Sequence, residues 1–168
     1  MAIDARDMRT AMGCFATGIT VVTSRTPDGV AVGMTVNSFN SVSLEPPLVL
    51  FSIDKSASRL EDFLRSDKFA VNILRDDQQA YSDAFAVSDG DPFEFHTPAN
   101  PDAEEAPLLE GVLASFQGRR YAVHEGGDHY IFIIEVTDLK NDASGHPLLY
   151  YRGRYGTVAP GGQSPSDG

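Results

Sequence analysis

The chain has 168 residues, of which 42% are hydrophobic and 10% aromatic, a composition typical of a globular domain with a sizeable core. Its 24 acidic and 13 basic residues give a net charge of −11, which argues against nucleic-acid binding, because that function needs a basic surface. The single cysteine, Cys14, excludes an intramolecular disulfide and a multi-thiolate zinc site.

The first predicted element is a helix over 3–15, in which apolar residues recur close to one face before Gly18 ends the pattern. Cys14 lies in this helix, and we expect it to be a small core residue instead of a nucleophile. No apolar run reaches the ~18 residues of a membrane span. The N-terminal sequence MAIDARDMRT lacks the pattern of a signal peptide, so we expect a cytoplasmic protein.

Strand-like segments, rich in β-branched and aromatic residues, follow one another with only two helices between them, predicted over 58–66 and 76–85. The predicted strands span 19–24, 30–36, 48–53, 68–74, 112–124, 130–140, 148–151 and 155–158. Strands arriving in runs favour an antiparallel barrel over a doubly wound parallel sheet. We predict a mainly β fold, in one domain over 1–158, and a disordered tail over 159–168 that has no apolar anchor.

The run GMTVNSFNSVSLEPPLVLFSIDKSAS, residues 33–58, is the most informative part of the sequence. VAVGMTV and PPLVLFSI are predicted to be neighbouring antiparallel strands, and the short polar side chains between and after them can hydrogen-bond a flat polar ring. Ser58 and Glu61 fit a capping box, so residues 54–58 would lead into a helix N-terminus that suits an anion. An ordinary hairpin and an ordinary capped helix fit the same pattern.

The segment 88–105 contains six acidic residues, three prolines and no lysine or arginine, and it is predicted to be a long loop. Two interpretations stay open. It is either a solvated connection or a flap whose Phe93, Phe95 and His96 pack over the edge of a ligand. An acidic protein that binds anionic nucleotides has to gather its basic residues at the phosphates. The candidates are Lys55, Arg59, Arg119, Arg120, Arg152 and Arg154.

Several common active-site motifs are absent from the sequence. No GxGxxG follows a predicted strand and no GxxxxGK[ST] occurs, which excludes a Rossmann or P-loop site. GxSxG is also absent, and the four histidines have no convincing metal-ligand spacing, so we predict no metal site. A nicotinamide nucleotide, if it is used, would therefore bind briefly, as a substrate and not as a permanent cofactor.

Four stretches together resemble the flavin reductase-like family, the FMN-binding split barrels that include reductase partners of two-component flavin monooxygenases. They are residues 33–58, MGCFATGITVVTS (12–24), GGDHYIFIIEV (126–136) and PLLYYRGRYG (147–156). Their order and spacing match the family over roughly 8–158. Ile134 and Gly118 depart from the pattern, standing where many members have glycine and cysteine. The first adds bulk that would alter nicotinamide access, and the second removes a thiol that hydride transfer does not need.

The resemblance implies an antiparallel split β-barrel and a homodimer. It also implies an NAD(P)H-dependent flavin reductase that transfers hydride from NADH or NADPH to FMN or FAD and supplies reduced flavin to a partner monooxygenase. By resemblance, the flavin ring and ribityl chain contact Met34, Thr35, Val36, Asn37 and Ser38. The ribityl chain and phosphate would continue along Ser52, Ile53, Asp54, Lys55, Ser58 and Arg59.

On the nicotinamide side, the resemblance implies a catalytic role for His129, next to Asp128, together with Arg154 and Tyr155. A histidine just after a Gly-Gly-Asp turn also fits a plain solvent-facing position. Two other functions stay open. One is a split barrel that binds flavin tightly and acts on its own small substrate. The other is a non-catalytic protein whose acidic loop docks a basic partner.

Overall fold

The computed structural model describes residues 3–87, 90–94, 96–100, 104–142 and 144–159. The helices are α1 (Ala5–Met12), α2 (Leu60–Arg65) and α3 (Gln79–Ala86), with one 3-10 turn, η1 (Pro92–Glu94). The strands are β1 (Thr17–Gly18), β2 (Thr20–Arg25), β3 (Ala31–Val36), β4 (Asn40–Leu44), β5 (Pro47–Asp54), β6 (Lys68–Ile73), β7 (Ala114–Gly126), β8 (His129–Asn141), β9 (Leu149–Tyr151) and β10 (Arg154–Gly156).

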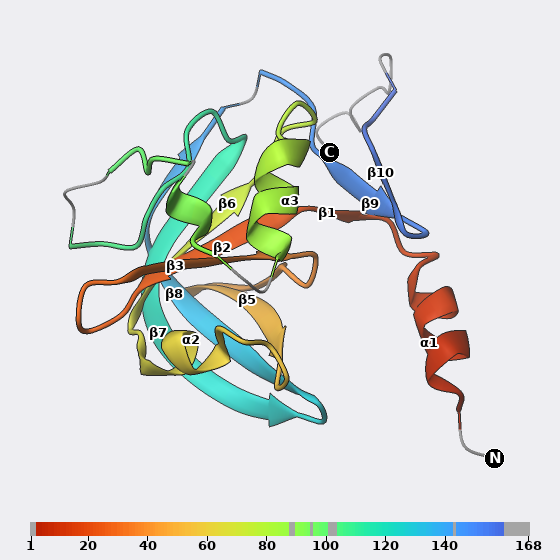
Figure 1. Cartoon of the computed structure of the whole chain (residues 1–168), viewed down its shortest axis with the longest axis horizontal. Helices are drawn as coiled ribbons and strands as arrows, with labels where there is room; N and C mark the ends of the chain where they lie inside the picture. The colour runs from red at the N-terminus through yellow and green to blue at the C-terminus, as the bar shows by residue number, and fades with distance from the viewer. Residues whose placement is uncertain (1–2, 88–89, 95, 101–103, 143, 160–168) are drawn as a thin grey trace.

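Seven strands form one antiparallel sheet in the order β3-β2-β6-β7-β8-β5-β4, and β1, β9 and β10 form a second, small sheet. Figure 1 shows the large sheet curving round, with α2 and α3 on different sides and the long β7–β8 hairpin running from the top of the view to the bottom. The predicted mainly β, antiparallel fold with a few short helices is confirmed.

One predicted pairing is wrong. The strands formed by VAVGMTV and PPLVLFSI, β3 and β5, are not neighbours: β3 lies at one end of the order and β5 pairs with β4 and β8. The strand β4 was not predicted, because its sequence NSVSL is polar and largely exposed instead of alternating clearly.

Aromatic side chains fill the core inside the curved sheet. Phe51, Phe63, Phe69 and Phe132 are at most 1% exposed, and their ring centroids lie 5.2 to 6.5 Å apart. Burying each such side chain contributes about 1.5–3 kcal/mol, so this cluster holds α2 onto the sheet. The strands β5, β6 and β8, which supply three of the four rings, thereby become a rigid platform for the turns at their ends.

Helix α1 is shorter than predicted and stands apart from the sheet, as Figure 1 shows. Asp4 caps it by accepting hydrogen bonds from the backbone nitrogens of Arg6 and Asp7. None of its residues is buried, and the apolar residues that predicted it are exposed. Cys14, just beyond its end, is also exposed, so its predicted place in the core is wrong.

Helix α2 begins at Leu60, and its N-cap residue Arg59 makes no side-chain capping hydrogen bond. The predicted capping box with Ser58 at the cap position is therefore wrong. Two acids in the first turn, Glu61 and Asp62, already complement the positive end of this short helix.

The described part of the acidic loop is fastened to α3. Phe93 packs edge-on against Phe85 with ring centroids 5.1 Å apart, and His96 lies 4.6 Å from the ring of Tyr81. Phe95 lies outside the described residues. The loop is thus partly ordered by packing, which argues against a wholly solvated connection over this part.

Among the described residues, no helix combines the length and the apolar character that crossing a membrane requires.

Candidate functional site

The turn that follows β5 meets the hairpin that joins β7 to β8. Strand pairing sets Asp54 opposite His129, and the backbone nitrogen of Lys55 donates to the carbonyl of Asp128 over 2.8 Å. One carboxylate oxygen of Asp54 accepts from both the backbone nitrogen and the hydroxyl of Ser56, each at 2.7 Å. The structure therefore brings together two predicted site segments that lie more than seventy positions apart in the sequence.

Charges interact at this junction. A ring nitrogen of His129, Nδ1, lies 2.7 Å from a carboxylate oxygen of Asp128, and this hydrogen bond lowers the pKa of Asp128. Hydrogen bonds from Ser56 lower the pKa of Asp54, and the charges of His129 and Arg9 add to that effect. Asp54, Asp128 and His129 offer ligand atoms within 4.8 Å of one another, but exposed acidic groups often gather in this way without a metal.

Lys55 already has a partner. Its ammonium group lies 2.8 Å from a carboxylate oxygen of Glu125 and 5.1 Å from the centroid of the Tyr130 ring. The hydrogen bond to Glu125 raises the pKa of Lys55, which therefore stays positively charged. Because exposed ion pairs contribute little, a phosphate can compete with Glu125 for this lysine.

The predicted ring-binding stretch presents few free hydroxyls. Thr35 donates to the carbonyl of Ser82 on α3 over 2.7 Å. The hydroxyl of Ser38 donates to the carbonyl of Ser52 over 3.0 Å and accepts from its backbone nitrogen over 2.9 Å. A ligand here would thus meet mainly backbone groups and the exposed side chain of Asn37.

Three more of the predicted contact residues face the interior. Val36 and Ile53 belong to the main core cluster, and Met34 packs against it. Their side chains support the strands, so any contact that they make with a nucleotide uses the backbone. The guanidinium of Arg59 donates to the carbonyl of Gly90, which ties the turn after β5 to the acidic loop.

Arg154 and Tyr155 lie on the β9–β10 hairpin. The hydroxyl of Tyr155 lies 2.8 Å from that of Ser82 and donates to a carboxylate oxygen of Asp83 over 3.2 Å, which fastens the hairpin to α3. Both predicted residues line a cavity of about 700 Å³ that Asn37 does not line.

A second cavity, of about 540 Å³, opens between α1, β1, the end of β3 and the same hairpin. It is lined by Asn37, by the candidate basic residue Arg152 and by residues that were not predicted, chiefly Arg9, Phe15, Thr17 and Tyr150. No pattern in the sequence singled out Arg9, because its neighbours in the cavity come from distant parts of the chain. Arg152 was noted only as one basic residue among several.

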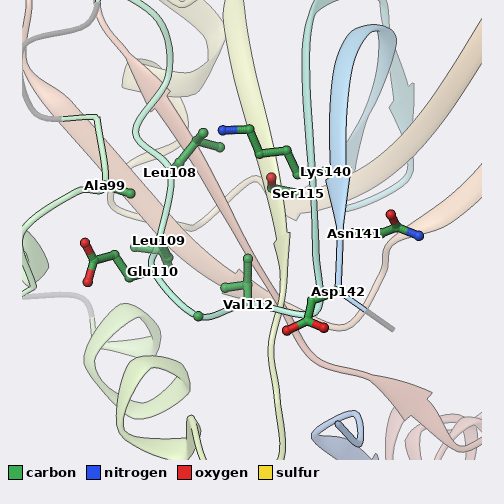
Figure 2. Close-up of a pocket in the computed structure, with 10 residues that line it drawn as sticks. Ala99, Leu108, Leu109, Glu110, Val112, Ser115, Lys140, Asn141 and Asp142 are labelled. Atoms are coloured by element: carbon green, nitrogen blue, oxygen red, sulfur yellow. The ribbon is translucent and has the colours of Figure 1, made fainter. Parts of the chain in front are cut away.

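Figure 2 shows a third cavity, of about 430 Å³, at the other ends of β7 and β8. Leu108, Leu109 and Val112 on the segment before β7 face Lys140 and Asp142 at the end of β8. None of the predicted site residues lines this cavity.

Known proteins resemble this chain in sequence and in fold. A model of the flavin reductase like domain matches residues 12–159. The chain belongs to this family. The FMN reductase (NADH) SmoA of Agrobacterium fabrum is 43% identical to it over 153 residues, which cover 91% of the chain and 86% of that protein.

Two further family members are similar over almost the whole chain. The reductase subunit HsaB of a flavin-dependent monooxygenase of Rhodococcus jostii is 40% identical, covering 95% of this chain and 80% of that protein. The solved structure of the Streptomyces globisporus NADH:FAD oxidoreductase SgcE6, in complex with NAD and FAD fragments, superimposes with a TM-score of 0.87 and 34% identity, covering 97% and 99% of the two chains.

Proposed function

We propose that this flavin reductase family member is an NAD(P)H-dependent flavin reductase, which transfers hydride from NADH or NADPH to FMN or FAD and supplies the reduced flavin to a partner monooxygenase. The observation that carries the proposal is that three predicted site segments adjoin one another in a chain of this family. Ser38, just after β3, hydrogen-bonds Ser52 on β5, and the turn after β5 meets the β7–β8 hairpin at His129. Relatives named as an NADH-dependent FMN reductase and as a monooxygenase reductase subunit support it.

The residues present fit a flavin nucleotide. The hydroxyl of Ser38 donates to the carbonyl of Ser52 and accepts from its backbone nitrogen. The turn after β3 is thereby held against β5, and the backbone groups of this turn keep fixed directions. Lys55 supplies a positive charge next to this turn, and in an acidic protein such a charge is what an anionic nucleotide needs. A bound flavin would supply the electron-accepting ring, and the reaction needs no general base from the protein.

His129 is proposed to contact the nicotinamide side. Asp128 holds the imidazole through Nδ1, which leaves Nε2 directed away from that carboxylate and available to a ligand. Asp54 lies opposite His129 in the strand register, and its carboxylate accepts a hydrogen bond from the backbone nitrogen of Ser56. Asp54 thereby holds the end of the hairpin that carries the histidine. These residues position the reactants, which is the protein's main contribution to a transfer between two cofactors.

We also propose a homodimer, supported by apolar side chains that the single chain leaves exposed. Ile3, Met8, Phe15 and Leu44 are 48 to 90% exposed, and α1 buries no residue. An eight-residue helix is marginal in water on its own, so a second copy covering its apolar face would stabilise it. Because the proposed hydride donors are cytoplasmic nucleotides, the proposal includes a cytoplasmic location.

The test is to mix the purified protein with NADH or NADPH, with and without FMN, FAD or riboflavin, and follow the loss of the reduced-nicotinamide absorbance in air. Many turnovers that require added flavin support the proposal and rank the flavins. Turnover that needs no added flavin, with stoichiometric flavin retained through purification, favours a tight flavoprotein instead. No turnover in any combination contradicts the proposal and favours a non-catalytic binding protein.

A further inference from the structure

The cavity of about 430 Å³ in Figure 2, hereafter the distal cavity, lies between two parts of the chain. One wall is the segment 108–112, which precedes β7, and the other is formed by the start of β7 and the end of β8. His129 begins β8 and Lys140 is its last residue but one, so almost the whole strand separates them. The distal cavity is therefore separate from the proposed flavin and nicotinamide site.

Backbone hydrogen bonds hold the walls of the distal cavity in place. The side-chain oxygen of Asn72, a residue with no exposed surface, accepts from the backbone nitrogen of Leu109 over 3.1 Å. The backbone nitrogen of Asp142 donates to the carbonyl of Leu113 over 2.6 Å, which joins the end of β8 to the opposite wall. The cavity is thus already formed in the single chain, so a ligand would have to order little of the protein on binding.

Ser115 places an unpartnered hydroxyl in the distal cavity. The residue is only 5% exposed, and its side chain lines the cavity. No described group hydrogen-bonds this hydroxyl. Figure 2 shows its oxygen beside Lys140, on the side that faces Leu108. A nearly buried hydroxyl without a partner is unfavourable, and an oxygen of a bound molecule that accepted its proton would remove this penalty.

Lys140 stands next to Ser115 on the neighbouring strand. The two residues are direct partners in the β7–β8 register, and side chains of such partners lie on one face of the sheet, with Cβ atoms about 4.5–5.5 Å apart. Within the described ranges, Lys140 forms no ion pair and no hydrogen bond, whereas Lys55 and Lys68 both pair with glutamates. A free ammonium group beside a free hydroxyl forms a pair of donors suited to an anion.

The acidic residues of the lining, Glu110 and Asp142, do not neutralise this lysine. One carboxylate oxygen of Asp142 lies 3.3 Å from the guanidinium of Arg75, and the other accepts from the backbone nitrogen and hydroxyl of Ser144. Figure 2 shows the carboxylate of Glu110 pointing away from Lys140. The positive charge of Lys140 thus remains available to a ligand.

The rest of the distal cavity is mainly apolar. Leu109 is 3% exposed, and Leu108 and Val112 beside it are partly buried, so their side chains form an apolar surface next to the two donors. An apolar lining with a few convergent polar groups is typical of small-molecule sites, whose volumes are roughly 300–1,000 Å³. The volume of about 430 Å³ lies in this range.

We propose that the distal cavity binds a small organic carboxylate. Its carboxylate group accepts hydrogen bonds from Ser115 and Lys140, and its apolar body packs on Leu108, Leu109 and Val112. A single negative charge matches the one free ammonium group among the described lining residues. A phosphate monoester carries about 1.5 to 2 negative charges, which would leave an excess in a chain whose net charge is already −11. The site is independent of the proposed flavin reductase function.

The test uses benzoate as the probe, in an NMR titration of the full chain that follows the backbone amides of 108–115 and 140–142. Three related molecules serve as comparisons. Benzamide removes the charge, benzylamine inverts it, and acetate removes the apolar ring. The titration is repeated with an excess of FMN, so that binding in the proposed flavin site is recognised.

Two variants remove the proposed donors one at a time. Lys140→Met keeps an apolar side chain of similar reach and removes the charge, and Ser115→Ala removes only the hydroxyl. Arg6→Gln is the matched control, because it removes an equal charge on α1, outside the lining. Thermal melts check the fold. Ser115→Ala should melt no lower than the wild type, because the deleted hydroxyl has no hydrogen bond to lose.

Benzoate should shift the amides of both cavity walls and bind about tenfold more tightly than each of the three comparison molecules. Lys140→Met should weaken benzoate binding about tenfold, the loss expected for a charged hydrogen bond. Ser115→Ala should weaken it about fivefold, as expected for a neutral one. Arg6→Gln and an excess of FMN should change nothing.

Equal binding of benzoate and benzamide overturns the proposal, and so do wild-type affinities in both cavity variants. Displacement of benzoate by FMN also overturns it, because the probe would then occupy the flavin site. A lower melting temperature of Ser115→Ala would show that the hydroxyl has a structural partner, which removes its role in the cavity. Flavin reduction is not part of these measurements, so the two proposals fail separately.

Discussion

At the scale of single residues, Gly118 and Ile134, the two departures from the family pattern, lie close together on β7 and β8. A Cβ at Gly118 would lie 2.2 Å from the carbonyl oxygen of Glu135 and 2.8 Å from a methyl carbon of Ile134. The sequence suggested that the bulk of Ile134 would alter nicotinamide access. Ile134 is instead 2% exposed and belongs to the core, so it does not obstruct that access. The strand register shifts between Gln117 and Gly118, where β7 approaches β8.

The residue Gly118 is therefore expected to tolerate no side chain. Gly118→Ala should destabilise the protein by about 1–3 kcal/mol, because the new methyl group meets backbone that cannot move aside. Urea unfolding measures the change. Gly18→Ala is the control, since a Cβ there meets nothing within 4 Å, and it should change stability by less than about 0.5 kcal/mol. Equal stability of the two variants would contradict the inference that Gly118 on β7 tolerates no side chain.

The histidine of the β7–β8 hairpin is expected to matter for the nicotinamide and not for folding. His129→Gln should lower kcat/KM for NADH about tenfold with FMN as acceptor, or about 1.4 kcal/mol of transition-state stabilisation. Its thermal melt should match that of the wild type. His124→Gln, an exposed histidine on the same hairpin, serves as the control. Equal loss of activity in both variants would mean that His129 has no special role.

The acid sensitivity of the turn after β5 follows from Asp54. Hydrogen bonds from Ser56 lower its pKa in the folded protein, so its contribution to stability is present above the unfolded pKa, about 3.9, and is lost as the pH falls through the folded pKa. Thermal melts of the wild type and Asp54→Asn should therefore differ near neutral pH and converge in acid. A difference independent of pH would contradict this assignment.

Individual hydrogen-bond partners were the part of the site that the sequence did not reveal. Serines and threonines in residues 33–58 correctly indicated a polar, hydrogen-bonding segment. The partner of Thr35 is Ser82 and the partner of Ser38 is Ser52, and such distant pairings depend on the strand order and not on local pattern. For the same reason Arg9 and Arg152 became neighbours of Asn37 only in the folded chain.

At the scale of elements, Arg120 closes the end of α2. Its guanidinium donates to the carbonyls of Phe63, Leu64 and Ser66, the groups that a helix leaves unsatisfied at its C-terminus. It is therefore engaged with this helix end instead of forming part of a basic phosphate site.

Arg120→Met should destabilise the protein by about 1–3 kcal/mol, because buried carbonyls lose their donor. The neighbouring Arg119→Met removes an exposed arginine on the same strand and should be close to neutral. Chemical unfolding distinguishes the two variants. Comparable effects would show that Arg120 contributes only charge.

Element positions were predicted well where the sequence pattern is strong. Segments rich in β-branched and aromatic residues gave β6 and β8 almost to their bounds, 68–74 against Lys68–Ile73 and 130–140 against His129–Asn141. The short strands β1 and β4 carry no such pattern. The apolar face of α1 indicated a helix correctly but was taken for a core face, because periodicity does not tell which surface covers it.

At the scale of the whole molecule, the exposed apolar face of α1 predicts self-association. Met8→Glu places a charge on that face outside the cavity lining, and should shift a dimer towards monomer in light scattering. Glu61→Gln, on the exposed first turn of α2, is the control and should leave the mass unchanged. A wild type that is monomeric at working concentration would contradict the proposed homodimer.

The proposed reaction is hydride transfer from a reduced nicotinamide to a flavin on this chain. The first measurement is to mix the protein with FMN and NADH without oxygen and to follow the absorbance of the oxidised flavin. The flavin should bleach in step with NADH oxidation, and more slowly when the transferring C4 hydrogen is deuterium. A flavin that stays oxidised, or that bleaches equally fast without the protein, would rule out hydride transfer on this chain.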